Sequence, residues 1–399
     1  MDWITTPEGR AARALAAELL TSFPGDPLQV GSGLRRALPD LQSEHAALAV
    51  EQAQLAAIAL QRYGMQAQEL LLTRDGLEQA TRPEVARRRA ALLKASGASL
   101  IVDLTAGLGF DVSAFLDTGL PVIAVERDPL TARYLAENTP GAEVIAGDAT
   151  LIIDELLSRV EPGAVFFLDP ARRSGRRTAD GSRAQSERDP QRWSPSWSFV
   201  TELAQRGARV CVKLAPGFDP ALVPVGWAGV WTSVRREPVE AMLCSWALGS
   251  LRTACAIGKE TVEFSADGRS RLHKAPIGTW LHEPDVSLVQ AQLLNDFCEK
   301  QPPLARTDES IAWLTSAGPV VHPMLRSYQV LEVLPNDMRA LRKQLIAREI
   351  GELTIKTRGM KIDADAMRRE LRLPPGGPAT IAILKESGRR STVLVHEHS

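Results

Sequence analysis

Cysteine is scarce in this sequence, and the few cysteines present are not arranged for metal or redox chemistry. None of them forms a CxxC pair, so neither a zinc knuckle nor a CxxC redox motif is present, and a chain of 399 residues with four cysteines has no disulfide framework. The six histidines show no metal-ligand spacing, so we expect no metal site. A reduced, cytoplasmic location fits this usage. The cysteines are Cys211, Cys244, Cys255 and Cys298.

Long hydrophobic runs and a surplus of charge of one sign are also missing. No apolar run approaches the roughly 20 residues that cross a bilayer. The first ten residues lack the basic start and apolar core of a signal peptide. We therefore expect no membrane segment. Lys and Arg total 47 against 48 Asp and Glu, a net charge of -1, which excludes a wholly basic nucleic-acid coat protein but leaves room for local asymmetry.

What the sequence does contain is typical of globular domains. Hydrophobic residues make up 44% and charged residues 24%, and the length suits two or three domains of about 150 residues each. Residues 1–95 are rich in Ala, Leu and Glu and are predicted to be helical. Within them, Thr81 with Pro83 and Glu84 predicts a helix start, with Thr81 as the N-cap of a capping box.

Residues 96–250 alternate short apolar runs with helical patterns, which predicts βαβ units and a parallel sheet. The last two strands of this region are separated by too few residues for a helical crossover, so they form an antiparallel hairpin. The predicted fold class is α/β, with a Rossmann-like sheet of five parallel strands and a terminal antiparallel hairpin. The expected strands are 100–104, 122–126, 142–146, 164–168, 208–214, 228–235 and 239–248.

The rest of the chain is predicted to contain a connector and a second small domain. Residues 251–320 form the connector, with a hairpin-like stretch at 254–264 and one helix near 286–300. Residues 321–399 alternate strands and helices and suffice for a small α+β domain. The expected elements there are strands at 328–333, 353–356, 379–384 and 391–395 and helices at 336–347 and 364–371.

A glycine turn follows the first predicted strand and is the start of the chemical argument. A dinucleotide fold needs G-x-G-x-x-G, but here Gly107 and Gly109 are followed by Val112 at the third position. Asp103, just before the turn, would repel a pyrophosphate. The turn therefore favours a ligand with a cationic or zwitterionic end, such as the methionyl part of S-adenosylmethionine. A structural tight turn is the alternative.

Three further acids follow the next strands of the predicted sheet. Glu126 lies 19 residues after Gly107, where an acid can accept both ribose hydroxyls. Asp148 follows the third strand, where it can accept from an adenine amine. Asp169 ends the fourth strand before Pro170, beside the expected cofactor. Each acid alone is compatible with an ordinary loop position, but together at one sheet edge they predict a binding site.

These motifs resemble those of the class I S-adenosylmethionine-dependent methyltransferases. DLTAGLGFD is similar to their cofactor loop, AVERD to the ribose segment, GDA to the adenine segment and LDPAR to the substrate-side motif. The resemblance implies cofactor-binding, catalytic and substrate-binding roles. The implied residues are Asp103, Thr105, Gly107, Gly109, Asp111, Glu126, Arg127, Asp148 and Ala149 for the cofactor, Asp169 and Pro170 for catalysis, and Arg172, Arg173, Arg176 and Lys213 for the substrate.

A narrower resemblance concerns the bacterial methyltransferases that carry a C-terminal THUMP-like domain. TRPEVARRRAALL, LDPARR and LHEPD are similar to segments of that group, and KTRGMKID to the central part of its THUMP-like domain. LDPAR also resembles the RNA uracil-5-methyltransferases, but those need a nucleophilic cysteine where this chain reads VKLAP. Cys211 nearby sits inside an apolar strand, so the sequence favours methylation of an amine, which needs no protein nucleophile.

Local charge indicates the partner. Residues 171–192 hold seven Arg against three acids and precede Trp193 and Trp197, and residues 325–399 hold 14 Lys and Arg against nine acids. Solvated surface charge and core tryptophans are the alternative. The sequence predicts methylation of a base nitrogen in RNA, either tRNA or rRNA. The other hypotheses are a non-catalytic RNA-binding or assembly protein on this scaffold and a small-molecule methyltransferase. No signal for an oligomeric state is present.

Overall fold

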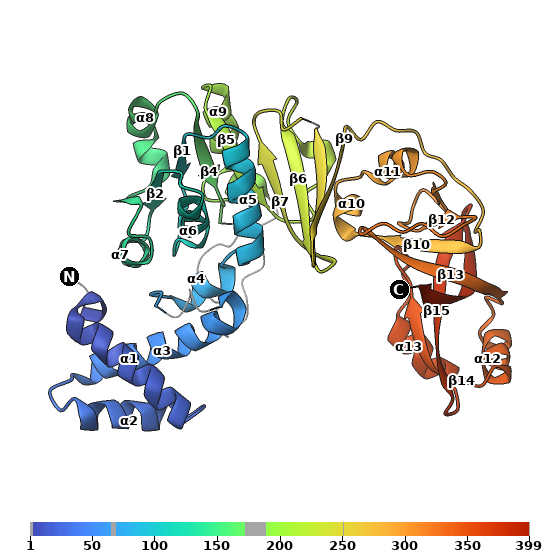
Figure 1. Cartoon of the computed structure of the whole chain (residues 1–399), viewed down its shortest axis with the longest axis horizontal. Coiled ribbons are helices and arrows are strands. Elements are labelled where there is room, and N and C mark those ends of the chain that lie inside the picture. Colours follow the sequence, from blue (N-terminus) through green and yellow to red (C-terminus); the bar gives the residue numbers. More distant parts are fainter. Residues whose placement is uncertain (1–2, 65–68, 172–188, 250, 399) are drawn as a thin grey trace. The chain divides into compact units, whose positions relative to one another are not determined.

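The computed structural model describes residues 3–64, 69–171, 189–249 and 251–398. The chain divides into two compact units, Met1–Lys213 and Leu214–Ser399. Figure 1 shows helices alone at the start of the chain, followed by strands and helices in alternation and then by a second sheet.

In the described residues, five α-helices precede the first strand and confirm the predicted helical start of the chain. Three of them begin at side-chain caps, in which Thr6, Asp26 and Thr73 accept a hydrogen bond from a backbone N–H of the first turn. Proline at the start of α1, α2 and α5 fits the same positions, where its missing N–H costs least. The helices are α1 (Pro7–Ser22), α2 (Pro27–Ala37), α3 (Ser43–Tyr63), α4 (Arg74–Gln79) and α5 (Pro83–Ala95).

The predicted cap of α5 is wrong. Its N-cap residue is Arg82, and no side chain caps the helix. The Thr81 hydroxyl instead donates to Asp111 at 2.7 Å and accepts from Lys213 at 2.9 Å. A capping box needs the threonine oxygen for the backbone, and here two side chains of the site occupy it.

The first sheet confirms the predicted parallel core. Its nine strands have the order β3-β2-β1-β4-β5-β7-β6-β8-β9, and β1 to β5 pair in parallel. All five residues of β4 are buried, as expected for a sheet covered on both faces. The elements are β1 (Leu100–Asp103), α6 (Phe110–Asp117), β2 (Val122–Glu126), α7 (Pro129–Asn138), β3 (Glu143–Ala146), α8 (Ala149–Arg159), β4 (Ala164–Leu168), α9 (Trp197–Gln205) and β5 (Arg209–Leu214).

The predicted hairpin is also present, and two more strands extend it. β6 and β7 pair antiparallel, β8 pairs in parallel with β6, and β9 pairs antiparallel with β8. The hairpin-like stretch expected in the connector is therefore part of this sheet. The strands are β6 (Ala228–Val234), β7 (Glu237–Cys244), β8 (Arg252–Ile257) and β9 (Thr261–Ala266).

The second sheet has the order β11-β12-β10-β13-β16-β15-β14, with α12 and α13 packed on β14. It confirms the predicted C-terminal α+β domain and takes three strands from residues before 321. The elements are β10 (Trp280–Pro284), α10 (Val286–Gln290), α11 (Leu294–Lys300), β11 (Ala305–Arg306), β12 (Leu314–Ser316), β13 (Leu325–Leu334), α12 (Met338–Ala347), β14 (Ile350–Lys356), α13 (Ala364–Leu371), β15 (Gly377–Glu386) and β16 (Arg389–His398).

One helix of the predicted set is wrong. The stretch 286–300 was expected as a single helix but forms α10 and α11, and Gln292 between them has a φ of 54°. A left-handed residue cannot continue a right-handed helix, so the helix stops there. The domain boundaries at 95, 250 and 320 stay predictions.

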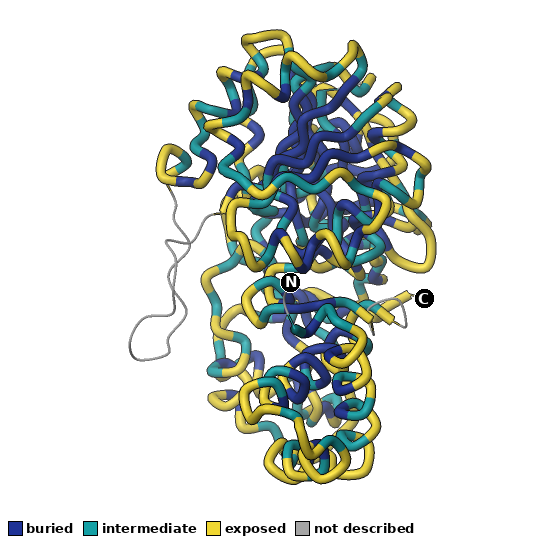
Figure 2. Tube along the Cα trace, turned by 90° about the vertical axis from the view of Figure 1, so that its left-hand side faces the viewer, coloured by how far each residue is buried: buried dark blue, intermediate teal, exposed yellow. Residues whose placement is uncertain are grey.

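Burial follows the strands. Figure 2 shows the buried residues concentrated in the strands of the sheet, with exposed residues along loops and outer helix faces. Among the residues that the structure describes, no helix combines the length and apolar character needed to cross a membrane.

Two side-chain amides fix Leu71 and Leu72, which lie just before α4. Gln52, on α3, donates to the Leu72 carbonyl at 2.7 Å and accepts the Leu72 N–H at 2.9 Å. Asn138, at the end of α7, does the same for Leu71 and also donates to the Leu108 carbonyl at 3.0 Å. These bonds satisfy backbone groups that no strand or helix would pair, and they tie the N-terminal helices to the glycine turn.

We expect Asn138→Ala to destabilise the first unit by about 2 kcal/mol or more, because it removes the partner of three backbone groups. The measurement is urea unfolding together with amide hydrogen exchange of residues 70–72, which should lose protection. Glu137→Ala is the matched control, since its exposed ion pair with Arg10 contributes little. Equal stability of the two variants would contradict the assignment.

Candidate active site

The turn between β1 and α6 is anchored residue by residue to its neighbours. The Leu104 N–H donates to the Phe167 carbonyl at 2.9 Å, and the Ala106 N–H donates to the Val125 carbonyl at 3.0 Å. Leu108, at the tip of the turn, is only 4% exposed and packs in a cluster with residues of α3 and α4. The turn therefore has one fixed conformation.

The two glycines of this turn face different surroundings. Gly107 has a φ of 55°, and a Cβ built there would meet nothing within 4 Å. Gly109 has a φ of 89° and caps α6, and a Cβ there would lie 2.6 Å from Thr139 and 2.8 Å from Leu135. Gly107 therefore leaves space on the open side of the turn, whereas Gly109 allows α6 and α7 to pack closely.

Glu126 joins the glycine turn to the end of β2. Its Oε2 accepts the Gly107 N–H at 2.9 Å, and its Oε1 accepts the Asp128 N–H at 2.8 Å. The adjacent Arg127 is exposed and donates to the Ser194 hydroxyl at 3.2 Å. The carboxylate is thus held in place at the sheet edge by two backbone donors.

Asp148 ends the turn after β3 and caps α8, whose first residue is the buried Ala149. The Thr150 N–H and hydroxyl both donate to its Oδ1, at 2.9 and 2.7 Å. These bonds lower the pKa of Asp148, so the carboxylate is ionised at neutral pH.

Asp103 is a buried acid, 1% exposed, at the end of β1. Its Oδ1 accepts the Thr105 N–H at 2.9 Å. Burial raises the pKa of Asp103 well above its usual range, and the nearby Asp111 and Asp169 raise it further, while the hydrogen bond from the Thr105 N–H and, less, the charge of Arg89 oppose the shift. A cationic group bound here would favour the ionised form, so this acid fits a ligand with an ammonium or sulfonium end.

A chain of polar contacts runs behind the turn to the end of β4. Arg89, on α5, is buried under the ring of Phe167 and forms an ion pair with Asp111. Asp111 accepts from Thr81, and Thr81 accepts from Lys213.

The chain ends at Asp169. The Lys213 Nζ donates to Asp169 Oδ2 at 2.6 Å, and the Asp169 N–H donates to the Thr105 hydroxyl at 2.6 Å. The side chain of Asp169 is 31% exposed and that of Lys213 is 12% exposed, while Pro170 is buried. The contacts fix Asp169 from two sides and leave part of its carboxylate open to a ligand.

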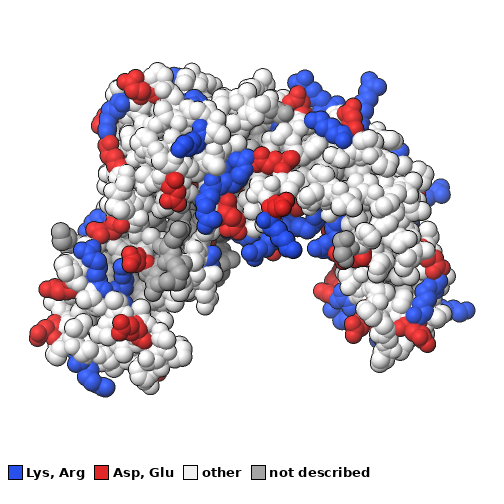
Figure 3. Space-filling view, in the orientation of Figure 1, with Lys and Arg blue, Asp and Glu red and all other residues white. Residues whose placement is uncertain are grey.

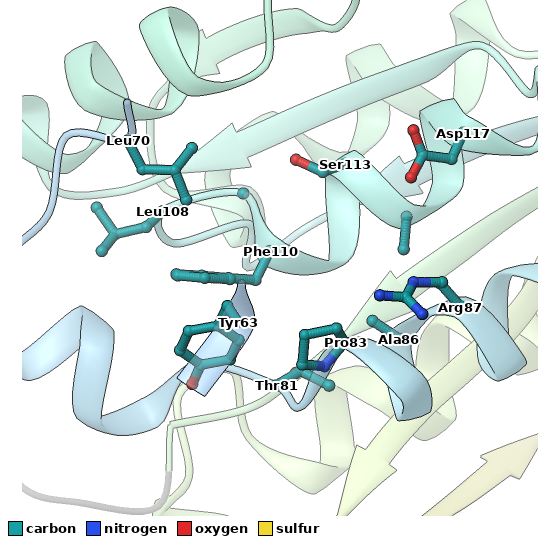
Figure 4. Close-up of a pocket in the computed structure, with 12 residues that line it drawn as sticks. Tyr63, Leu70, Thr81, Pro83, Ala86, Arg87, Leu108, Phe110, Ser113 and Asp117 are labelled. Carbon is teal, nitrogen blue, oxygen red and sulfur yellow. The ribbon is translucent and has the colours of Figure 1, made fainter. Parts of the chain in front are cut away.

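An apolar pocket adjoins this chain at Thr81. Figure 4 shows it between α5 and α6, with Tyr63 and Phe110 at one end and Arg87 and Asp117 at the other. The Tyr63 hydroxyl donates to the Ala80 carbonyl at 3.1 Å. The pocket is lined by Tyr63, Leu70, Thr81, Pro83, Ala86, Arg87, Leu108, Gly109, Phe110, Ser113, Ala114 and Asp117.

The structure brings most of the sequence-predicted site residues to one sheet edge, and their roles stay predictions. Thr105 contacts Asp169, and Asp111 contacts Arg89, through the bonds above. Arg172, Arg173 and Arg176 lie outside the described residues. Trp193 was predicted from the sequence to stack on bases, but it is only 9% exposed and packs edge-on against Trp197.

Sequence reasoning missed the residues that support the site from the N-terminal helices. Thr81 carried a signal, but for a helix cap. Arg89, Gln52 and Tyr63 carried none, because each lies in an ordinary helical pattern and acts only through long-range contacts. Among the described residues, no group of three or more His, Cys, Asp or Glu is arranged to hold a metal.

Known proteins are similar to this chain in sequence and in fold. Residues 325–398 match the THUMP domain-like family. Two uncharacterized S-adenosylmethionine-dependent methyltransferases of Mycobacterium tuberculosis, from strains CDC 1551 / Oshkosh and ATCC 25618 / H37Rv, are each 30% identical over 320 residues, which is 79% of this chain and 84% of the relative.

A crystal structure assigned as a methyltransferase of Porphyromonas gingivalis W83 has the same fold, with a TM-score of 0.77 over 98% of both chains at 18% identity. S-Adenosylmethionine is the cofactor of the relatives that this chain matches in sequence. The chain belongs to the S-adenosylmethionine-dependent methyltransferases and carries a THUMP-like domain at its C-terminus.

Proposed function

We propose that this enzyme methylates a base nitrogen in RNA, either tRNA or rRNA, by direct in-line transfer. The observation that carries the RNA assignment is the THUMP-like domain at residues 325–398, which follows a methyltransferase sheet in the same chain. The surplus of Lys and Arg over acids in residues 325–399 supports it, because RNA binding rests largely on phosphate contacts.

The cofactor would lie over the open side of the glycine turn. Gly107 leaves space for it, Glu126 is placed to accept ribose hydroxyls, and Asp148 an adenine amine. Asp103 would favour the positively charged methionyl end. When bound, S-adenosylmethionine supplies an electrophilic methyl group, so the protein's main task is to align the acceptor with it.

Asp169 is the residue that we assign to the acceptor amine. Its carboxylate is partly exposed and fixed by Lys213 and Thr105, so it can accept a hydrogen bond from an N–H and orient the nitrogen lone pair. The buried Pro170 restricts the backbone conformation of Asp169, the residue before it. Lys213 donates to Asp169, so we assign it to holding this carboxylate, whereas the sequence predicts a role in binding the substrate.

A covalent route through cysteine has no support in the structure. All four cysteines of the chain are buried, and Cys211, the one nearest the end of β5, has no exposed surface. A ring-carbon methyltransferase of the uracil-5 type would need an accessible thiolate beside the base. Amine methylation requires only alignment and removal of one proton.

The deciding experiment is incubation of the full chain with methyl-labelled S-adenosylmethionine and total bacterial RNA, followed by nucleoside mass spectrometry. We expect label in a base-methylated nucleoside, and none with Asp169→Asn, which keeps the side-chain shape but removes the carboxylate charge. Label in a small-molecule extract and none in RNA would replace the proposal with the small-molecule alternative.

We expect Glu126→Ala to weaken S-adenosylmethionine binding at least tenfold, because it removes an acceptor of charged hydrogen bonds worth about 1.5–3 kcal/mol each. Isothermal calorimetry measures this directly. Glu143→Ala, an exposed acid on β3, is the control and should bind normally. Unchanged affinity in a folded Glu126→Ala protein would remove the ribose assignment.

Lys213→Met tests how Asp169 is held. We expect kcat to fall about tenfold or more while cofactor affinity changes less than threefold, since Lys213 contacts Asp169 and Thr81 and none of the predicted ribose or adenine ligands. Thr81→Val should give a smaller loss of the same kind. A large loss of cofactor affinity with kcat retained would place Lys213 at the cofactor instead.

A further inference from the structure

The hairpin that joins β6 and β7 turns through two consecutive arginines in an unfavourable conformation. Val234 pairs with Glu237, so Arg235 and Arg236 form a two-residue loop, with φ values of 50° and 68°. Positive φ at both positions is the type I′ arrangement, for which Asn-Gly is the usual sequence. A residue with a Cβ is sterically strained at positive φ, and here two consecutive residues are strained in this way.

The turn between β15 and β16 is of the same kind, but its residues are less strained at positive φ. Between β15 and β16, Glu386 pairs with Arg389, and the loop is Ser387 and Gly388, with φ values of 48° and 82°. The β6–β7 turn therefore does not need arginine for its geometry. Strained backbone retained with large charged side chains is a reason to look for a function.

Other cations surround one of these arginines. The Arg236 guanidinium donates to the Glu283 carbonyl at 2.7 Å. The Glu283 carboxylate pairs with Arg358 at 3.3 Å and with Lys356 at 3.6 Å. Arg326 lies directly opposite Glu283 in the β10–β13 pairing and forms its own ion pair with Glu397. The β6–β7 turn and the ends of β10, β13 and β14 thus share one group of cations, all within the second unit.

Positive charge exceeds negative charge in this group. Glu283 and Glu397 are acids that pair with its cations, and Glu237 follows Arg236 directly in the hairpin. A further acid, Asp285, is 2% exposed and accepts from Ser233 and Ser287 inside the protein, so the five cations still outnumber the acids. Figure 3 shows Lys and Arg side chains gathered over the tip of the β6–β7 hairpin and the adjoining end of β10. The five cations are Arg235, Arg236, Arg326, Lys356 and Arg358.

The side chain of Arg235 is the one in this group that most favours an external ligand. It is exposed, and the structure gives its guanidinium neither a hydrogen bond nor an ion pair with any described residue. Arg236, by contrast, is partly buried and fixed by the Glu283 carbonyl, so it supports the turn from below. An arginine kept at a strained, exposed position with no internal partner has its planar donor fork directed at solvent, where phosphate is a matching acceptor.

We propose that the Arg235–Arg236 turn, together with Arg326, Lys356 and Arg358, binds phosphates of the RNA backbone. This rests on the proposed function and deepens it: the RNA-binding surface is made jointly by the methyltransferase sheet and the THUMP-like domain rather than by the latter alone. Backbone contacts of this kind position a substrate without reading its sequence.

The test measures binding of unfractionated bacterial tRNA to the full chain by fluorescence anisotropy over a range of KCl concentrations. We expect Arg235→Gln to reduce the slope of log K against log salt by about 0.7–0.9, the value for one lost phosphate contact. Arg235→Gln combined with Lys356→Gln and Arg358→Gln should reduce it by about 2–3 and weaken binding at least tenfold. At positions 356 and 358, glutamine keeps a side-chain N–H donor for Glu283 and removes the positive charge.

Arg339→Gln, an exposed arginine on α12, is the matched control and should bind tRNA as the wild type does. Wild-type affinity and slope in the triple variant would overturn the phosphate site while leaving the proposed function intact. A wild-type protein that binds no tRNA but methylates a small molecule would instead overturn the proposed function. If the wild-type chain bound an acidic protein through these arginines, and its tRNA binding did not change with salt, the phosphate site would also be excluded.

A second variant separates charge from backbone strain. Arg235→Asn places a residue that favours positive φ in the turn, so we expect an equal or higher melting temperature together with weaker tRNA binding. Ser387→Asn makes the same change in the β15–β16 turn and should leave tRNA binding unchanged. Weaker binding in both variants, or a lower melting temperature for Arg235→Asn, would mean that the arginine serves the fold.

Discussion

The conformation of the turn from Asp103 to Asp111 is the constraint on which the rest of this enzyme depends. One side of the turn must stay open for a cofactor, so its anchors come from the other sides. Glu126 holds the Gly107 amide, Asn138 holds the Leu108 carbonyl, and Arg89 holds Asp111. These anchors come from α5, β2 and α7, so they lie on both sides of the turn in the sequence. The last N-terminal helix is therefore a structural part of the proposed cofactor site.

The same arrangement places two carboxyl groups of this sheet edge in different electrostatic environments. Asp103 is buried and by itself resists ionisation, whereas Asp169 lies beside Lys213 and is partly open to solvent. In the proposed function, Asp103 responds to the positively charged ligand and Asp169 is the fixed acceptor next to it. The environment of each acid, rather than its residue type, makes the two carboxyls differ.

The sequence was sufficient to predict the parallel strands, the hairpin and the edge where the acids gather, because strand periodicity and turn residues are local signals. It could not predict that Thr81 gives its hydroxyl to Asp111 and Lys213, or that Gln292 divides a helix, because tertiary contacts decide both. The two glycines looked equivalent in sequence. Only the positions of Thr139 and Leu135 show that Gly109 serves packing and Gly107 leaves space.

The THUMP-like segment is not a separable module in this chain. The family match begins at residue 325, where β13 begins, yet β13 pairs with β10 on one side and with β16 on the other. Cutting the chain before β13 would leave β10 without its main partner and would expose an unpaired strand edge, which favours aggregation. The cations of Lys356 and Arg358 also meet Glu283 of β10. Point substitutions in the full chain are therefore the sound way to separate the proposed RNA binding from methyl transfer.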